Sequence, residues 1–400
     1  MKEIKIFEFF SGIGSQMKAL KNLEKSLNFI TKSVGACDFY IDAIVSYMCI
    51  HHGNLEPEND FTKEEMISIL NKFKFSNNSK DIVGENYFKK INEQKLRKLF
   101  PYLFAFVNND YFNKKYDKNI LQYERLNATD IRDFDTLPDS IDILTYSFPC
   151  QDLSQQGKQK GIEKNTRSGL LYEIERILKL NLNNLPKVLI LENVKALVSK
   201  KFINQFNAWI NALSELGYKS SWKIINASDF GSAQNRERVF MVSVLSNENF
   251  EFPKIDENNS KNVSDIWEYN GEHKIIQLDS NQKMNDFKMT KNKIQKAFIN
   301  NYSNFNSENY IYSINSKGAT LTASGANSRL KFWVNNEIQI MNSLEALLYM
   351  GFESDDYEKI KNSNLLNENK IIFTAGNSIS VEVLENLFKK IIKEVITNEQ

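Results

Sequence analysis

A glycine-rich turn follows the first apolar run of the chain, in the segment FFSGIGS from Phe9 to Ser15. Such a turn at the carboxyl end of a strand, followed by the helical pattern QMKALKNL, brings backbone N–H groups close to a ligand. The turn lacks the third glycine of the dinucleotide fingerprint and the Gly-Lys-Ser/Thr of a phosphate-binding loop. On its own it is equally compatible with a tight structural turn.

Two acidic residues follow later strand-like segments and extend this pattern. Asp38 and the aromatic Phe39 are the last two residues of the segment SVGACDF, and Asp130 lies in NATDIRD. An acid at the end of a second strand accepts hydrogen bonds from ribose hydroxyls, and a neighbouring aromatic ring can stack on adenine. Asp130 could meet the adenine amino group. Each alone is compatible with a surface or capping residue, but their order after successive strands favours a nucleoside site.

A cysteine stands at the exit of another apolar run, in the segment SFPCQDLSQQG from Ser147 to Gly157. Free cysteines buried in strands are inert packing residues. Cys150 instead begins a polar, glycine-containing loop, where a thiol can be reached and converted to thiolate by local positive charge. The segment therefore indicates a nucleophile.

Charged residues mark the ends of two further runs. Glu192 lies in LENV at the end of a strand, where a carboxyl group in a desolvated pocket can hold a proton or bind a ring edge. Arg236 and Arg238 alternate in QNRERVF as the chain enters a strand, so both could point to the same side. A surface salt bridge explains each of the three taken singly.

Short apolar runs predict the strands that would position these residues, at 4–10, 141–148, 187–194 and 238–245. Helical patterns lie between them, with apolar residues on one face of 170–182 and a second helix around 203–216. Strands alternating with helices predict an α/β fold with a mostly parallel sheet covered on both sides. Such sheets bind ligands beyond the carboxyl ends of their strands, which is where the candidate residues stand.

Other stretches indicate the domain organisation. Residues 53–127 are rich in Lys, Asn, Phe and Tyr and predict a partly helical insertion. Residues 246 to about 285 are Asn-rich and charged, and mark a change of lobe. The last segment contains an amphipathic helix from 380 onwards. We therefore expect a catalytic domain at 1–245, a smaller lobe at 246–340 and a segment at 341–400 that returns to the catalytic domain.

Composition excludes several classes of protein. Hydrophobic residues make up 42% of the 400 residues and charged residues 25%, which is typical of a folded globular protein. No stretch approaches the roughly 20 apolar residues that span a bilayer, and three cysteines and three histidines without zinc-finger spacing predict a metal-free, cytoplasmic protein.

The net charge of +1 says nothing about nucleic acid, but residues 283–331 carry a local surplus of six positive charges that could neutralise phosphates. A solvated lysine-rich face explains that surplus equally well.

The ordered set of FSGIGS, SFPCQ, LENV, QNRERVF, TLTASGANSR and AGNSIS resembles the DNA (cytosine-5) methyltransferase family, and the order Pro-Cys-Gln then Glu-Asn-Val is specific to it. TYSFPCQDLSQQGKQKG, NTRSGLLYEIERIL and TLTASGANSR look most like the bacterial CpG-specific members. The resemblance implies a Rossmann-like sheet that binds S-adenosylmethionine, with a smaller target-recognition lobe. It also implies double-stranded DNA as partner, and one copy of the chain suffices for the chemistry.

The resemblance implies a role for each matching residue. In the cofactor pocket, Asp38 would hold the ribose, although the family normally has Glu there and the shorter side chain must reach further. The other residues implied there are Phe10, Ser11, Gly12, Ile13, Gly14, Phe39, Asp130, Ile131, Pro149, Asn377 and Ser378.

By the family mechanism, Cys150 adds to C6 of a cytosine flipped out of the duplex, while Glu192 protonates or hydrogen-bonds N3. Arg238 would lie near the base carbonyl, with Arg236 supporting the pocket or a phosphate. Ser154 and Gln155 are candidates to close over the base. Sequence recognition would come from the loop 322–329, through Thr322, Ser324, Gly325, Asn327 and Arg329.

Three alternatives remain at this point. An RNA-directed member of the family would use the same residues on a tRNA loop. A catalytically silent DNA-binding relative is disfavoured because Cys150, Glu192 and Arg238 are all present. A nicotinamide enzyme is disfavoured because the dinucleotide fingerprint is incomplete.

Overall fold

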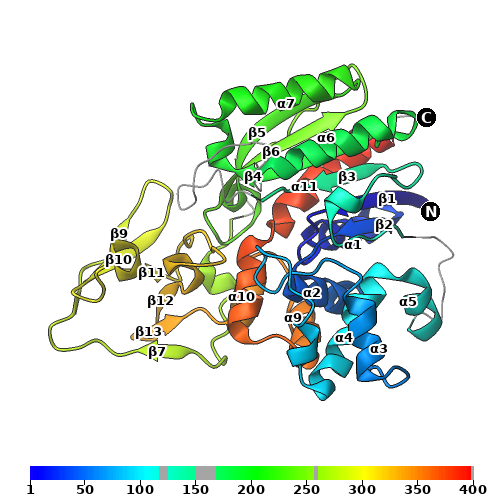
Figure 1. Ribbon diagram of the computed structural model, residues 1–400. Coiled ribbons are helices and arrows are strands. Elements are labelled where there is room, and N and C mark those ends of the chain that lie inside the picture. Colours follow the sequence, from blue (N-terminus) through cyan, green and yellow to red (C-terminus); the bar gives the residue numbers. More distant parts are fainter. Residues whose placement is uncertain (117–124, 150–167, 256–259, 398–400) are drawn as a thin grey trace. The chain divides into compact units, whose positions relative to one another are not determined.

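The computed structural model describes residues 1–116, 125–149, 168–255 and 260–397 (Figure 1). The chain forms two compact units. Unit 1 comprises Met1–Ile224, Arg238–Pro253 and Leu387–Gln400, and unit 2 comprises Ile225–Glu237 and Lys254–Asn386. Of the segment 341–400 that we expected to return to the catalytic domain, residues 341–386 pack in unit 2. The chain therefore passes between the units more often than the sequence patterns suggest.

Unit 1 is built on a six-stranded sheet in the order β2-β1-β3-β4-β6-β5. β1 pairs in parallel with β2 and β3, β3 pairs in parallel with β4, and β6 runs antiparallel to β4. The sheet is therefore mostly parallel, as predicted. Its strands are β1 (Lys2–Phe9), β2 (Phe29–Cys37), β3 (Ile143–Tyr146), β4 (Val188–Val194), β5 (Lys219–Asn226) and β6 (Glu237–Val244).

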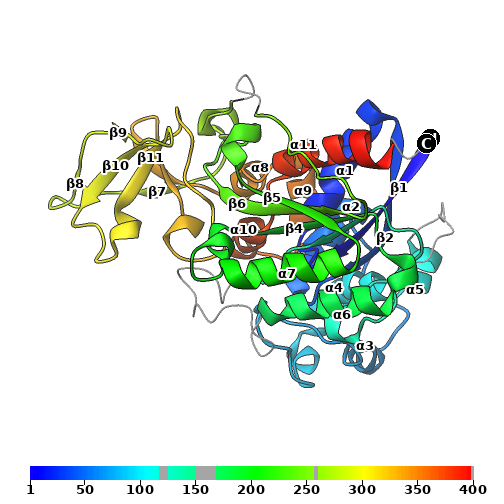
Figure 2. The ribbon, with the colours of Figure 1, turned by 90° about the horizontal axis from the view of Figure 1, so that it is seen from above.

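One face of this sheet packs on α6 (Leu171–Leu180) and α7 (Ile203–Glu215), which lie on the same side of the strands in Figure 2. Alternate strand residues face these helices because successive side chains point to opposite faces. The shared core contains Phe7, Phe9, Leu144, Tyr146, Leu189, Leu191, Val239 and Met241 from the strands, with Ile174, Ile177, Phe206, Trp209 and Leu213 from the helices.

The intervening strand residues face α1 (Ser15–Leu27) and α2 (Ile41–His52). Glu8, between Phe7 and Phe9, accepts hydrogen bonds from the N–H of Met17 in α1 and the hydroxyl of Tyr47 in α2. Within 53–116 and 125–127, the described part of the segment predicted to be an insertion, α4 packs against α2 and α3. Its described helices are α3 (Lys63–Leu70), α4 (Glu93–Val107) and α5 (Asn109–Lys115).

Unit 2 contains a smaller sheet in the order β7-β13-β12-β11-β10-β8, with β9 also paired to β10. Its strands are β7 (Lys274–Ile276), β8 (Lys283–Met284), β9 (Lys288–Met289), β10 (Gln295–Asn300), β11 (Tyr310–Ser313), β12 (Lys331–Val334) and β13 (Glu337–Ile340). The helices that follow are α8 (Ser343–Leu348), α9 (Ser354–Asn362), α10 (Glu368–Asn377) and α11 (Val381–Ile391), the last continuing as a π-helical turn at Ile392–Ile396.

A glycine permits close packing at the β1–β2 pair. The strand register shifts between Ile6 and Phe7, opposite Gly35. A Cβ atom on Gly35 would lie 2.3 Å from the ring of Phe7 and 2.4 Å from the carbonyl oxygen of Leu126. Any side chain at this position would therefore push the first strand away from the second.

We expect Gly35→Ala to lower the free energy of unfolding by about 1–3 kcal/mol, because the added methyl group overpacks a buried site. Gly84→Ala is the control, since a Cβ atom there meets nothing within 4 Å. Urea unfolding of both variants measures the difference, and equal stability of the two would contradict the packing argument.

Candidate active site

The glycine turn at the end of β1 is held in an unusual backbone conformation. Phe10, Gly12 and Gly14 all have positive φ angles, of 55°, 56° and 78°. The N–H of Ser11 donates to the carbonyl of Cys37 at 3.1 Å, and the N–H of Gly14 donates to the carbonyl of Ser11 at 2.9 Å. A Cβ atom on Gly12 would meet nothing within 4 Å, so space is open above that residue.

Asp38 connects this turn to the end of the second strand. Its carboxylate accepts the N–H of Gly12 at 2.8 Å through one oxygen and the N–H of Tyr40 at 2.9 Å through the other. Burial raises the pKa of Asp38 to about 6, although both backbone hydrogen bonds oppose that shift. Each carboxylate oxygen keeps a second lone pair, so the group can still accept a ligand hydroxyl.

The segment containing Asp130 lies next to Asp38. The N–H of Asp38 donates to the carbonyl of Ala128 at 3.2 Å. The Asp130 carboxylate is bound by the guanidinium of Arg132 at 2.7 Å and the ammonium of Lys74 at 3.3 Å, and Ile131 is buried. Burial raises the pKa of Asp130, but the hydrogen bonds from Arg132 outweigh burial and the net pKa is lowered. The three predicted cofactor segments therefore meet at one edge of the sheet.

A polar cluster of Glu8, Tyr47 and His51 supports the glycine turn, and none of these residues was predicted as part of the site. Nε2 of His51 lies 3.2 Å from the carbonyl oxygen of Ile13, and the imidazole packs at a tilt against the ring of Tyr47, with ring centroids 4.7 Å apart. A Cβ atom on Gly14 would lie only 2.2 Å from Nε2 of His51. Burial lowers the pKa of His51, so a neutral imidazole is the form that contacts the turn.

The Tyr47 hydroxyl also donates a hydrogen bond to the carboxylate of Glu8 at 3.0 Å, so Glu8 belongs to the same cluster. Burial raises the pKa of Glu8 to about 7. A glutamate inside an apolar β1 run, IKIFEFF, is the signal that could have drawn attention to the cluster. Its partners come from a different helix, so the sequence alone does not identify them.

The residues at this edge fit a nucleoside with an attached polar chain. The hydroxyl oxygen of Ser11 is buried and has no hydrogen-bond partner among the described residues, so it is free to bind a ligand atom. Phe39 is half-buried beside Asp38, which suits stacking on a base. Pro149 is half-buried after β3, while Asn377 and Ser378 end α10 in unit 2.

Glu192 and Arg238 face each other across β4 and β6. Glu192 stands opposite Phe240 in the strand register, so Arg238 lies diagonally across from it on the same face of the sheet. Nε of Arg238 lies 3.3 Å from Oε1 of Glu192, and the two side chains are 18% and 11% exposed. The pair is therefore a largely desolvated carboxylate and guanidinium, at the end of β4 and the start of β6.

Asn193 of β4 binds the segment that follows the neighbouring strand β3. Its side-chain Nδ2 donates to the carbonyl of Phe148 at 3.0 Å, and the amide is buried. Phe148 stands two residues before Cys150. Cys150, Ser154 and Gln155 lie outside the described residues, so their predicted roles stay predictions. The bond nevertheless connects the segment leading to Cys150 with the strand that carries Glu192.

The predicted recognition loop in unit 2 is internally hydrogen-bonded. The Thr322 hydroxyl donates to the carbonyl of Ser324 at 2.9 Å, and Nδ2 of Asn327 donates to the carbonyl of Thr320 at 3.0 Å. Gly325, with φ 79°, makes the turn between them. Arg329 is exposed and pairs with Glu308 at 2.6 Å.

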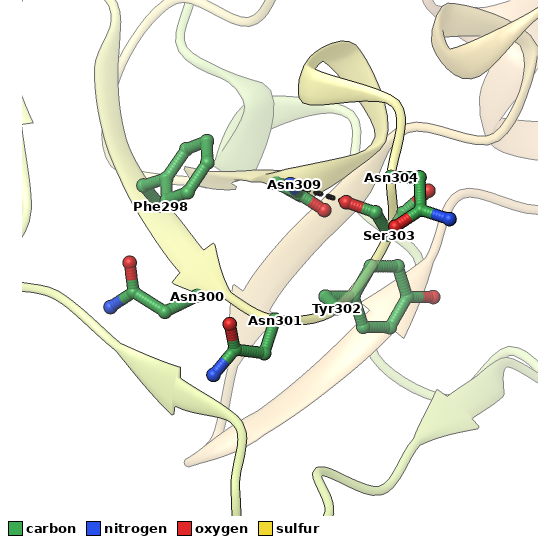
Figure 3. A pocket seen from close by; sticks show the side chains of 7 residues that line it. All are labelled: Phe298, Asn300, Asn301, Tyr302, Ser303, Asn304 and Asn309. Atoms are coloured by element: carbon green, nitrogen blue, oxygen red, sulfur yellow. Dashed lines mark hydrogen bonds between the residues drawn. The ribbon is translucent and has the colours of Figure 1, made fainter.

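A polar hollow of about 710 Å³ lies at the end of β10 and in the segment that follows it in unit 2 (Figure 3). Glu308 directly precedes Asn309, which lines the hollow, and its carboxylate pairs with Arg329 of the recognition loop. The ring of Phe305 is 73% exposed. The hollow is lined by Phe298, Asn300, Asn301, Tyr302, Ser303, Asn304 and Asn309, in which Asn309 donates to the carbonyl of Ser303.

Comparison with known proteins identifies the family. A family model described as C-5 cytosine-specific DNA methylase matches residues 89–393. The orphan methyltransferase M.SssI of Spiroplasma monobiae is 43% identical over 397 residues, covering 98% of this chain and 97% of that protein. The chain belongs to the C-5 cytosine-specific DNA methylase family. This confirms the resemblance seen in the motifs, and makes the protein a DNA (cytosine-5-)-methyltransferase.

Another methyltransferase sequence and two solved methyltransferase structures are also similar to this chain. The type II methyltransferase M2.ScrFI of Lactococcus lactis subsp. cremoris is 33% identical over 98% of this chain and 99% of its own length. Among solved structures, the Entamoeba histolytica methyltransferase EhMeth aligns with a TM-score of 0.57 at 16% identity, covering 99% of both chains. The S. pombe Dnmt2 methyltransferase aligns with a TM-score of 0.55 at 16% identity, covering 98% of both chains. These likenesses confirm the predicted methyltransferase fold.

Within 1–116, 125–149, 168–255 and 260–397, no group of three or more His, Cys, Asp or Glu side chains is arranged to hold a metal ion. In that same part of the methyltransferase, no helix has the length and apolar character needed to cross a membrane.

The buried carboxyl of Glu8 makes a pH-dependent prediction. The carboxyl titrates near pH 4.5 in the unfolded chain and near pH 7 in the folded one, so stability falls as the pH rises through this interval. Glu8→Gln removes this titration. Between pH 5 and pH 8 the variant is expected to lose about 2–3 kcal/mol less stability than the wild type. Urea unfolding at both pH values measures this, and parallel losses in the two proteins would refute the assignment.

Proposed function

We propose that this methyltransferase transfers a methyl group from S-adenosylmethionine to C5 of a cytosine flipped out of duplex DNA, at CpG steps. The observation that carries the proposal is the meeting of the glycine turn, Asp38 and the segment 128–131 at one sheet edge, in the same unit as the Glu192–Arg238 pair.

The residues of that edge account for cofactor binding. Asp38 would accept the ribose hydroxyls, Phe39 would stack on the adenine, and Asp130 with Ile131 would frame the base. The positive-φ turn of residues 10–14 leaves room above Gly12 for close approach of the ligand, and the unpaired hydroxyl of buried Ser11 offers it a hydrogen bond. When bound, S-adenosylmethionine would supply an electrophilic sulfonium methyl group.

The protein side chains overcome the weak nucleophilicity of cytosine C5. The Cys150 thiolate would form a bond to C6, while Glu192 would hold a proton or hydrogen bond at N3, so that electron density reaches C5. C5 would then take the methyl group as the methyl–sulfur bond of the donor breaks and the neutral thioether leaves. A base or water then removes the C5 proton, the C6–sulfur bond breaks and the ring regains aromaticity. Arg238, whose Nε lies 3.3 Å from Oε1 of Glu192, would hold both Glu192 and the base carbonyl.

Duplex DNA would be bound through unit 2. The recognition loop of Thr322, Ser324, Gly325, Asn327 and Arg329 would contact base edges, with Arg329 exchanging Glu308 for guanine. The Asn-lined hollow and the exposed ring of Phe305 extend this surface, and lysines such as Lys283 and Lys288 on β8 and β9 are exposed for phosphate contacts. The CpG target rests on the resemblance of the motifs to CpG-specific members.

The function is tested by methylating a plasmid of known sequence with S-adenosylmethionine and locating modified cytosines by bisulfite conversion. The wild type is expected to modify CpG cytosines, and Cys150→Ser to modify none while still binding duplex DNA, because a hydroxyl is a far weaker nucleophile than a thiolate. Modification outside CpG would overturn the target. A fully active serine variant would overturn the covalent scheme.

The pKa of Asp38 predicts how cofactor binding depends on pH. Below about pH 6 the carboxyl takes up a proton and loses its charge-assisted hydrogen bonds to the ribose, so affinity should fall about tenfold between pH 7 and pH 5. Asp38→Asn should bind weakly and with little pH dependence. Calorimetric titration with S-adenosylmethionine measures both, and an equally steep profile in the variant would assign the effect elsewhere.

An RNA-directed activity is the second candidate, because the same catalytic residues would act on a tRNA loop. Transfer of labelled methyl groups to duplex DNA and to total tRNA under identical conditions separates the two. Preference for tRNA would contradict the proposed substrate, although the chemistry at Cys150 would stand.

A further inference from the structure

We propose that Arg236 is a positioning residue that fastens the recognition loop at 320–329 to the end of α10. In this way it holds the DNA-binding and cofactor-binding segments of unit 2 in one arrangement. The inference rests on the proposed function, since it takes the loop as a DNA contact and Asn377 with Ser378 as cofactor contacts.

The guanidinium of Arg236 spans two distant segments. One terminal nitrogen donates to the carbonyl of Leu321 at 2.7 Å, and the other donates to the carbonyls of Ser378 at 2.9 Å and Gly376 at 3.3 Å. The residue is 4% exposed. Because the guanidinium is a rigid planar fork, it fixes the direction of both segments as well as their separation.

The end of α10 is a favourable place for this charge. The last carbonyls of a helix have no partner within the helix and carry partial negative charge. Gly376 is the second-last residue of α10, and Ser378 is its C-cap residue. A buried cation that binds these carbonyls is therefore stabilised by the helix end.

Gly376 in α10 also lies against the recognition loop, because it has no side chain to separate the two backbones. A Cβ atom on Gly376 would lie 2.4 Å from the carbonyl carbon of Thr322 and 2.5 Å from the backbone nitrogen of Ala323. The recognition loop thus rests directly on α10 at a residue without a side chain. The fork of Arg236 and the close approach at Gly376 specify one position of the loop.

The backbone around Arg236 is itself fixed. Its N–H donates to the side-chain oxygen of Asn226 at 2.9 Å, and its carbonyl accepts the N–H of Ala227 at 2.9 Å. These bonds fix the backbone from which the side chain extends, and so limit the movement of the guanidinium.

Neighbouring residues hold the base of the loop independently of Arg236. The hydroxyl of Thr320 donates to the carbonyl of Asn235 at 2.6 Å, and the N–H of Leu321 donates to the side-chain oxygen of Gln234 at 3.3 Å. Loss of the fork should leave these bonds and the fold intact while releasing the loop from α10. This separates the role of Arg236 from general stability.

The same contacts distinguish Arg236 from a phosphate-binding arginine. Its side chain is buried and engaged with carbonyl groups of the protein, whereas Arg329 is exposed at the loop. Within QNRERVF, Arg238 therefore serves the reacting base and Arg236 serves the position of the loop.

The test compares steady-state kinetics of Arg236→Lys with the wild type, varying duplex DNA and S-adenosylmethionine separately. Lysine keeps the charge but cannot span both segments, so the KM for each substrate is expected to rise about tenfold with kcat changed less than about twofold. Arg329→Lys is the matched control and should raise the KM for DNA only, because the Arg329 side chain is exposed and pairs with Glu308.

Three outcomes would overturn the proposal. A lower kcat with both KM values unchanged would indicate a smaller folded fraction and a purely structural role. A rise in the KM for DNA alone would indicate a phosphate contact, and unchanged kinetics would indicate no role. If Arg236→Lys does not fold, Gly376→Ala disturbs the same contact from α10 and should give the same double KM effect. Absence of DNA methylation by the wild type would instead contradict the proposed function.

Discussion

The carboxylate of Asp38 accepts the N–H of Gly12 at 2.8 Å, and the N–H of Ser11 donates to the carbonyl of Cys37. These bonds join the ends of two parallel strands, β1 and β2, at one sheet edge. Parallel strands present all their carboxyl ends together, so that residues from distant parts of the sequence meet without long connections. The predicted cofactor pocket depends on this constraint, since neither the turn nor the acid alone would specify a ligand.

The polar group under the glycine turn shows how that edge is supported. Glu8, Tyr47 and His51 lie where one would expect apolar packing, and burial raises the pKa of the carboxyl to about 7 and lowers that of the imidazole. Burying polar groups is unfavourable unless they are hydrogen-bonded. The contact from His51 to Ile13 and the close approach of Gly14 indicate that this cost maintains the position of the turn.

The two arginines of QNRERVF show how positions only two residues apart acquire different roles. Arg238 belongs to β6 and lies on the same sheet face as Glu192, opposite the apolar face of Val239 and Met241. Arg236 precedes the strand and packs in unit 2, where its guanidinium is engaged by carbonyl groups. Alternation along the chain predicted a shared side, but the strand begins only at Glu237, so the period-two rule does not extend to Arg236.

The sequence by itself determined the family, the order of the motifs and most of the strands in unit 1. Apolar runs at 141–148, 187–194 and 238–245 and the turn at Phe9–Ser15 are local signals, set by burial and backbone conformation within a few residues. Only the tertiary structure decided that β6 is antiparallel, that His51 supports the turn, that Glu8 is buried against Tyr47 and that Arg236 binds the end of α10. Each of these depends on a partner far away in the chain, and residue type does not encode which distant carbonyl or hydroxyl a side chain will meet.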